Sequence, residues 1–179
     1  DARLVLLLEF QAQAPMLEAE HLLTMQACFA LSYSTYQSGR FGGFVLDACR
    51  MVKTTLRHGQ GDLSCVAYVA YVTAMSAMRR PYPDCYAMGK LALALAERRS
   101  NQYFRLTVYQ YFSPFYQHWC EPLGNTLANL EKGLEFGLAG INPLSAGFCA
   151  LLRSVNRFLM GTPLGELVSE CEQGMAFLQ

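Results

Sequence analysis

The uncharged stretch LSCVAYVAYVTAMSAM, residues 63–78, indicates how this chain folds. Turn-forming sequences flank it, Gly59-Gln60-Gly61 before it and Arg80-Pro81-Tyr82-Pro83 after it. The stretch is longer than a typical β-strand, and it falls short of the ~20 apolar residues that a membrane-spanning helix needs. We therefore expect a helix that is buried on all sides inside the protein, and no membrane span.

Apolar segments and short breaks alternate in the same way along the rest of the chain, and the segments have the lengths of helices. The expected helices are a lead-in helix from Arg3 to Gln13 and eight more at about 16–37, 41–58, 62–79, 83–99, 101–118, 122–138, 142–160 and 163–178. Asp62 and Asn142 are suited to cap helix N-termini. Gly59 is suited to end the helix before it.

The breaks recur with a period of about 40 residues, two helices in each period. Gly or Pro recurs near the start of the second helices, at Gly43, Pro83, Pro122-Leu123 and Pro163. Small residues recur in the first helices, at Ala27, Ala67, Thr107 and Gly147. This pattern predicts an all-α fold, an α-solenoid of about four stacked helical hairpins over 16–58, 62–99, 101–138 and 142–178. The period is too long for regular tetratricopeptide repeats, and its length would suit a HEAT-like array. An ordinary all-α bundle is the alternative.

The composition fits stacked repeats. Of the 179 residues, 53% are hydrophobic and 16% are charged, and the net charge is zero. Hairpins that bury both faces against neighbours need few charged residues. The zero net charge also argues against a nucleic-acid-binding protein, which normally shows a basic face. Both ends of the chain are apolar and helical in pattern. We therefore expect one helical-repeat domain over 1–179, a fragment of a larger protein whose exposed end repeats can self-associate.

The cysteines and histidines show no motif spacing. The odd number of cysteines and the absence of a Cys-x-x-Cys pair indicate buried, reduced thiols and a cytoplasmic location. The three histidines, His21, His58 and His118, lie far apart in the sequence. We therefore expect no metal and no cofactor. The seven cysteines are Cys28, Cys49, Cys65, Cys85, Cys120, Cys149 and Cys171.

Catalytic motifs are missing from the sequence, so we expect no enzyme. No signature of a nucleophile with its base is present. The glycine-rich segment from Gly39 to Gly43 lacks the ending of a phosphate-binding loop and is interpreted as the turn of the first hairpin. Glu166, Glu170 and Glu172 form either a solvated helix face or a contact with a basic neighbour.

The charge is uneven along the chain. Residues 40–105 contain ten Lys/Arg and four Asp/Glu, whereas the two ends are acidic. Arg79, Arg80, Arg98 and Arg99 lie at expected helix C-termini, where the helix dipole favours cations. They are also candidates for a basic ridge that binds an acidic partner surface.

Aromatic residues crowd residues 103–119. Tyr109, Phe112, Tyr116 and Trp119 share one stripe of a continuous helix, and Pro114 should kink that helix or remove one of its hydrogen bonds. The cluster is either a core between hairpins or a ligand pocket or partner groove. For the second reading, Tyr109, Tyr116 and Trp119 are the candidate contacts at an exposed rim.

Most of the chain from residue 59 to residue 179 resembles a known family, and the likeness extends less clearly through residues 17–58. The order YAMGKLALALAER at 86–98, Trp119, LEFG at 134–137 and FLMGTPL at 158–164 is similar to the TPR-like helical region of large bacterial multidomain signalling proteins. Those proteins join a serine/threonine-kinase-like domain, an AAA-type ATPase, this helical region, a GAF domain and often a histidine kinase. Asn142 stands where the family tends to have Asp. None of the family's catalytic residues lies in this region.

The resemblance implies a non-catalytic protein-interaction and signal-relay segment that links an ATPase module to an output module. The expected partners are flanking domains of the same chain or a signalling protein, with no nucleic acid. A partner would act by favouring one curvature of the hairpin stack. The alternative is a sensory small-molecule binding domain that uses the aromatic cluster at 103–119.

Overall fold

The computed structural model describes residues 14–78, 81–98, 101–139 and 142–177. These residues form eight α-helices and one short 3₁₀-helix, with a single isolated bridge between Pro15 and Gln60. The all-α fold class is therefore confirmed. The chain divides into two compact units, residues 1–99 and 100–179, and the boundary falls between the second and third expected hairpins.

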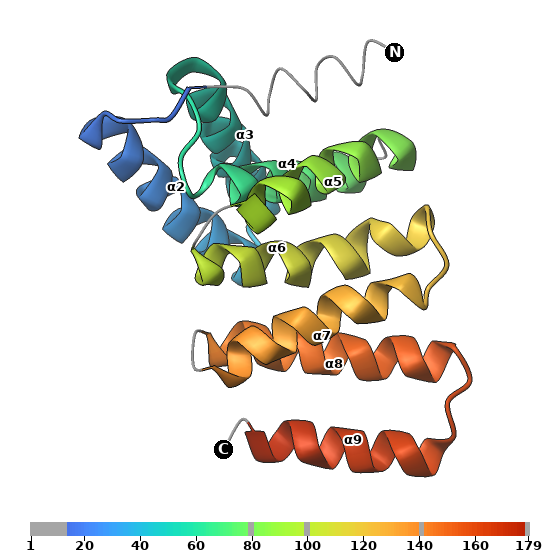
Figure 1. Cartoon of the computed structure of the whole chain (residues 1–179). Coiled ribbons are helices and arrows are strands. Elements are labelled where there is room, and N and C mark those ends of the chain that lie inside the picture. Colours follow the sequence, from blue (N-terminus) through green and yellow to red (C-terminus); the bar gives the residue numbers. More distant parts are fainter. Residues whose placement is uncertain (1–13, 79–80, 99–100, 140–141, 178–179) are drawn as a thin grey trace. The chain divides into compact units, whose positions relative to one another are not determined.

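The first unit contains α2 (Ala19–Gln37), α3 (Phe41–His58), α4 (Ser64–Ala77) and α5 (Tyr82–Arg98), each packed on the next (Figure 1). Its core joins Phe44 and Ala48 of α3 to Ala70 and Ala74 of α4. Ten of the fourteen residues of α4 are buried, which agrees with the prediction from the uncharged stretch, although the last turn of the helix is not buried. Burying one large aliphatic side chain contributes about 1.5–3 kcal/mol, so α4 anchors this unit.

The second unit contains α6 (Gln102–Phe115), the 3₁₀-helix η1 (Gln117–Trp119), α7 (Asn125–Leu138), α8 (Pro143–Leu159) and α9 (Leu164–Phe177). Figure 1 shows these helices as successive layers from α6 to α9. Each helix packs on the next, and α8 also contacts α6. The third helix of this unit therefore lies across both helices of the hairpin before it.

The helix bounds agree with the eight helices expected after residue 16, and most differ by only a few residues. The lead-in helix from Arg3 to Gln13 lies outside the described residues. The expectation of one helix over 101–118 is wrong, because α6 ends one residue after Pro114 and η1 follows. A proline donates no backbone hydrogen bond and clashes with the preceding turn, which accounts for the break.

Of the two expected N-cap residues, Asn142 and Asp62, one is confirmed and one is wrong. Asn142 Oδ1 accepts a hydrogen bond from the Ser145 backbone N–H at 3.1 Å, as expected. Asp62 does not cap α4, because the residue before that helix is Leu63. Instead, the Ser64 hydroxyl accepts from the Gly61 N–H at 3.0 Å and lies 3.1 Å from the Thr55 hydroxyl. A buried link to α3 therefore takes the place of a local cap.

Two glycines of α7 set its distance from α8. A Cβ added to Gly133 would lie 2.6 Å from Cys149 Sγ, and one added to Gly137 would overlap the Cβ of Ala146. At Gly137 only glycine fits, because the Cβ and backbone of Ala146 cannot move aside, whereas at Gly133 a Cβ would require the Cys149 side chain to shift. The close approach brings Cys149 into the buried core of this unit.

We predict that Gly137→Ala destabilises the second unit by about 1–3 kcal/mol, because the added methyl group overpacks against Ala146. Urea unfolding followed by circular dichroism measures the change. Gly165→Ala in α9 is the matched control, since a Cβ there meets nothing within 4 Å, and it should be neutral or slightly stabilising. Adding Ala146→Gly to the first variant should restore part of the loss, and an unchanged midpoint for Gly137→Ala would contradict the packing.

Candidate functional site

The α8–α9 hairpin carries an apolar groove. Its walls come from both helices, and the groove volume is about 440 Å³. Gly147 and Ala150 of α8 face Gly174 of α9, and a Cβ on Gly174 would lie 3.8 Å from that of Ala150. These small residues leave a hollow in the middle, whereas larger apolar side chains line the rest. The larger lining residues are Leu144, Phe148, Leu151 and Met175.

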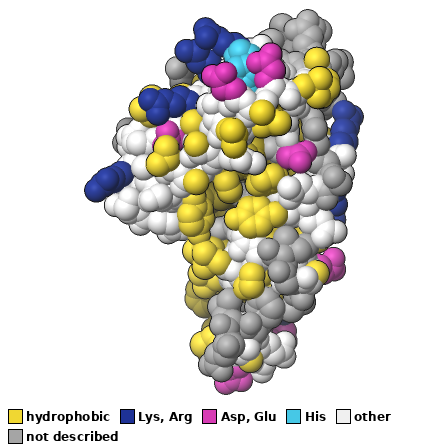
Figure 2. Space-filling view, turned by 90° about the vertical axis from the view of Figure 1, so that its left-hand side faces the viewer, with side chains coloured by type: hydrophobic (Ala, Val, Ile, Leu, Met, Phe, Trp, Pro, Cys, Tyr) yellow, Lys and Arg dark blue, Asp and Glu magenta, His cyan; other side chains and the backbone are white. Residues whose placement is uncertain are grey.

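The groove lies open on a hairpin with many exposed apolar side chains. Leu151 is 57% exposed, and it is one of a group of large hydrophobic residues exposed on α8 and α9. Hydrophobic side chains also reach the surface elsewhere, as Figure 2 shows for the face that it displays. A concentration of this kind marks a binding surface more often than a solvated one. The other members are Leu144, Val155, Phe158, Leu159, Leu164, Val168 and Met175.

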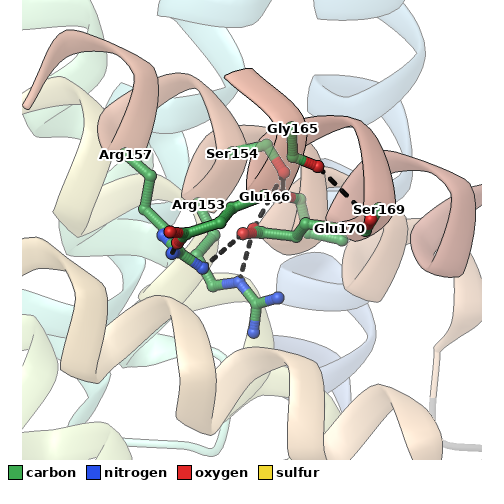
Figure 3. Close-up of polar contacts among 8 residues, drawn as sticks. Arg153, Ser154, Arg157, Gly165, Glu166, Ser169 and Glu170 are labelled. Carbon is green, nitrogen blue, oxygen red and sulfur yellow. Dashed lines mark hydrogen bonds and ion pairs between the residues drawn. The ribbon is translucent and has the colours of Figure 1, made fainter. Parts of the chain in front are cut away.

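A buried carboxylate holds the two walls of the groove together. Glu170 of α9 is 8% exposed, and its Oε1 accepts hydrogen bonds from Arg153 Nε at 2.8 Å and from the Ser154 hydroxyl at 2.9 Å. Its Oε2 accepts from Arg157 Nη1 at 2.6 Å. Arg157 also contacts Glu166 at 3.2 Å (Figure 3). Charge-assisted hydrogen bonds from two arginines fix the rotation of α9 against α8.

The pKa of Glu170 reflects this environment. Burial raises it, but the hydrogen bonds from Arg153 and Ser154 and the charges of Arg153 and Arg157 lower it more. The net pKa is lower than that of an ordinary glutamate. The expectation of a solvated face is therefore wrong for Glu170, and the alternative, a contact with a basic neighbour, is confirmed. The sequence did not indicate that this neighbour is α8.

We predict that the stability of the second unit falls in acid. A lowered carboxyl pKa in the folded state contributes stability above the unfolded-state pKa, about 4.3, and this contribution is lost as pH falls through the folded-state value. Glu170→Gln should remove about 1–3 kcal/mol at neutral pH and flatten the pH profile of the unfolding midpoint below pH 5. The exposed Glu172→Gln is the control and should keep the wild-type profile. Two identical profiles for Glu170→Gln and wild type would contradict this role.

The expected basic ridge is described only in part. Arg98 is the last residue of α5 and is exposed. Arg79, Arg80 and Arg99 lie outside the described residues. Arg98 does lie at a helix C-terminus, as the sequence indicates, and its role in binding a partner stays a prediction.

Three residues of the aromatic stripe, Tyr109, Phe112 and Tyr116, are part of the core. Tyr109 and Tyr116 are 2% and 1% exposed, so the expectation that they form an exposed rim is wrong. Tyr109 stacks on Phe136 of α7, with Lys132 lying over its ring. Trp119 is exposed, because the helix ends after Pro114 and η1 carries Trp119 out of the stripe. Of the three candidate aromatic contacts, Trp119 alone is open to a partner.

The fold brings together two histidines that the sequence keeps apart. The rings of His21 and His58 lie with their centroids 3.5 Å apart, and Glu18 Oε2 lies 3.1 Å from His21 Nε2. These residues and Arg57 line a hollow at the start of α2. The pair forms through a tertiary contact between α2 and the end of α3. The spacing of the two histidines in the sequence therefore does not predict it. Within the described ranges, no cluster of three or more His, Cys, Asp or Glu side chains could hold a metal ion.

The thiols divide into three groups by exposure. None of the seven cysteines forms a disulfide, Cys28, Cys65, Cys85 and Cys149 are buried as expected, and Cys49 is half-buried. Burial raises the pKa of Cys149 to about 12, which keeps that thiol protonated and unreactive. Cys120 and Cys171 are exposed, so the expectation of burial is wrong for them. Cys171 forms part of the groove wall.

Comparison of the chain with models of protein families, with curated proteins and with solved structures found no match. The likeness to the helical region of bacterial signalling proteins therefore stays a prediction. In the part of the chain that the structure describes, no helix has both the length and the apolar character needed to cross a bilayer.

Proposed function

We propose that this chain is a non-catalytic protein-interaction and signal-relay segment, and that the α8–α9 groove is its contact surface. The observation that carries the proposal is an apolar groove of about 440 Å³ on a hairpin whose outer side chains are largely hydrophobic. Contiguous apolar surface of this kind is costly to leave in water. A protein partner that covers it would gain most of its binding energy from this burial.

The occupant that best suits the groove is a helix. The second unit already contains such an arrangement, since α8 contacts both α6 and α7. Small residues form the closest contacts there, Ala146 and Cys149 against Gly137 and Gly133. Gly147, Ala150 and Gly174 give the α8–α9 groove the same small-residue floor. An amphipathic helix with small residues in its apolar face would therefore fit.

The relay would follow from continuous packing. We propose that the hairpins form one α-solenoid inside a signalling protein with ATPase and output modules, as the resemblance implies. The contact of α8 with both preceding helices supports a stack of this kind. In a stack, a partner that changes the packing of one hairpin changes the surface offered to the next.

A second candidate function is binding of a small apolar molecule. The groove has the volume of a typical ligand site, roughly 300–1,000 Å³, and its lining is almost wholly apolar. The groove therefore replaces the aromatic cluster as the place for this candidate, because Tyr109 and Tyr116 are buried in the core.

We predict that labelled amphipathic helical peptides with a small-residue stripe, including residues 143–159 themselves, bind the chain. Leu151→Glu places a charge in the groove wall and should weaken binding at least about tenfold, or ~1.4 kcal/mol. Fluorescence anisotropy measures the affinity. Leu46→Glu is the matched control, since Leu46 is similarly exposed, at 51%, on α3 in the other compact unit, and it should leave the affinity unchanged.

The same measurements separate the two candidates. If the peptides fail to bind, and small apolar compounds raise the melting temperature of wild type but not of Leu151→Glu, the groove is a ligand site. If neither peptide nor compound binds, both candidates are wrong.

A further inference from the structure

Two imidazole rings stack where the start of α2 meets the end of α3. His21 lies in the first turn of α2, and its side chain is 19% exposed. His58 is the last residue of α3 and is exposed. The ring centroids lie 3.5 Å apart and the ring planes are inclined by 30°, so the two faces are in van der Waals contact. A charge on either ring therefore acts directly on the other.

The segment that precedes α2 is fastened at the same place. We call residues 14–18 the strap. The Met16 N–H donates to the Gln60 carbonyl at 2.9 Å, and the Gln60 N–H donates to the Ala14 carbonyl at 2.8 Å. Gly59 has a φ of 94°, and a Cβ there would overlap the Ala14 carbonyl oxygen, so glycine permits this approach. Backbone hydrogen bonds and the stacked rings together hold the strap and the start of α2 against the end of α3.

Few buried side chains support the strap. Met16 is its one buried residue, whereas Leu17 is 80% exposed. In α2 the first buried residue is Met25, which lies beyond the first turn. Segments with few buried apolar contacts open locally more easily than a packed core does. A change in the force between the two rings can therefore change how often the strap opens.

The hollow beside the rings holds more potential positive charge than negative. Glu18 of the strap and Arg57 of α3 line it, and apart from the two histidines no other titratable side chain of the described residues does so. One proton on the pair is tolerated, because Glu18 Oε2 lies 3.1 Å from His21 Nε2 and supplies the opposite charge. The C-terminal end of α3 also favours a cation at His58. A second proton would place three cations beside one carboxylate, with two of the cations in contact.

We propose that His21 and His58 form a pH-sensitive latch, which holds the strap and the start of α2 closed and releases them when both rings are protonated. Histidine ordinarily gains its charge between about pH 8 and pH 5. Like charges in contact repel each other, and opening separates the rings and lets water solvate both. The latch makes the position of the α2 start depend on pH. It does not involve the α8–α9 groove, so its test is independent of the proposed function.

The direction of the response follows from the protons that each state binds. The closed latch holds one proton well and a second one poorly, whereas the open latch binds two. A fall in pH therefore shifts the population toward the open state.

Hydrogen exchange of the full chain, followed by NMR, tests the latch at the two strap amides, those of Met16 and Gln60. Corrected for the intrinsic effect of pH on exchange, their protection should fall at least about tenfold between about pH 7.5 and pH 5.5. The amide of Cys149, in the core of the other unit, should stay protected over this range. Glu170 gains its proton below this range, because its pKa is lowered.

A first pair of variants assigns the response to the histidines. His58→Gln keeps a polar side chain that cannot gain a proton, so protection of the strap amides should no longer depend on pH. His118→Gln is the matched control, since His118 lies in the other unit, and it should respond like wild type.

A second pair of variants tests the charge balance and leaves both rings in place. Glu18→Gln removes the carboxylate that balances the single proton, so opening should begin at a higher pH. Glu20→Gln is the control, because Glu20 is exposed in the first turn of α2 and does not line the hollow. Glu18 is 75% exposed, so Glu18→Gln should fold even if His58→Gln does not.

Three results would overturn the latch. The first is constant protection of the wild-type strap amides over the whole pH range. The second is an unaltered pH response in His58→Gln, or a response of Glu18→Gln that matches that of Glu20→Gln. The third is a parallel loss of protection at Cys149, which indicates general unfolding in acid.

Discussion

The close contact between α7 and α8 is the constraint on which the second unit depends. Gly137 has no Cβ, and the Ala146 methyl group occupies the space that one would need. The short distance between α7 and α8 is stabilised by van der Waals attraction, and a single methyl group added at Gly137 would force the helices apart. With α8 held at this distance, Cys149 enters the core with Leu106 and Leu130. The helix α9 packs on a neighbouring face of α8, the face that carries Gly147, Ala150 and Ser154.

The ion pairs between α8 and α9 determine how α9 packs on α8. The side chains of Arg153 and Arg157 reach from α8 to α9, and Glu170 bonds to both arginines and to Ser154 of α8. A buried carboxylate without such partners would be expensive, so the rotation of α9 is restricted. That rotation turns Cys171, Gly174 and Met175 toward α8 and creates the groove. The polar contact therefore shapes an apolar surface.

The sequence predicted much of the helix pattern and little of the site. The sequence predicted helix ends where local chemistry determines them, as at Asn142 and Gly59, but it did not predict that α6 ends just after Pro114. The sequence did not predict which side chains are exposed. Tyr109 and Tyr116 looked like contacts because tyrosine suits a surface, but Phe136 and the rest of the core cover them. His21 and His58 meet only after α2 folds back on α3. Glu170 required the register of α9 on α8.

The sequence by itself determined that this protein is all-α, with turns where glycine, proline and asparagine act on their own neighbours. It also indicated close packing at Gly147 through the recurrence of small residues in the first helices. Only the tertiary structure decided which small residues are covered. Gly133 and Gly137 lie beneath α8, whereas Ala27 and Ala30 are exposed and Gly147 lines a groove. Burial depends on which helices lie nearby in space, and no local pattern contains that information.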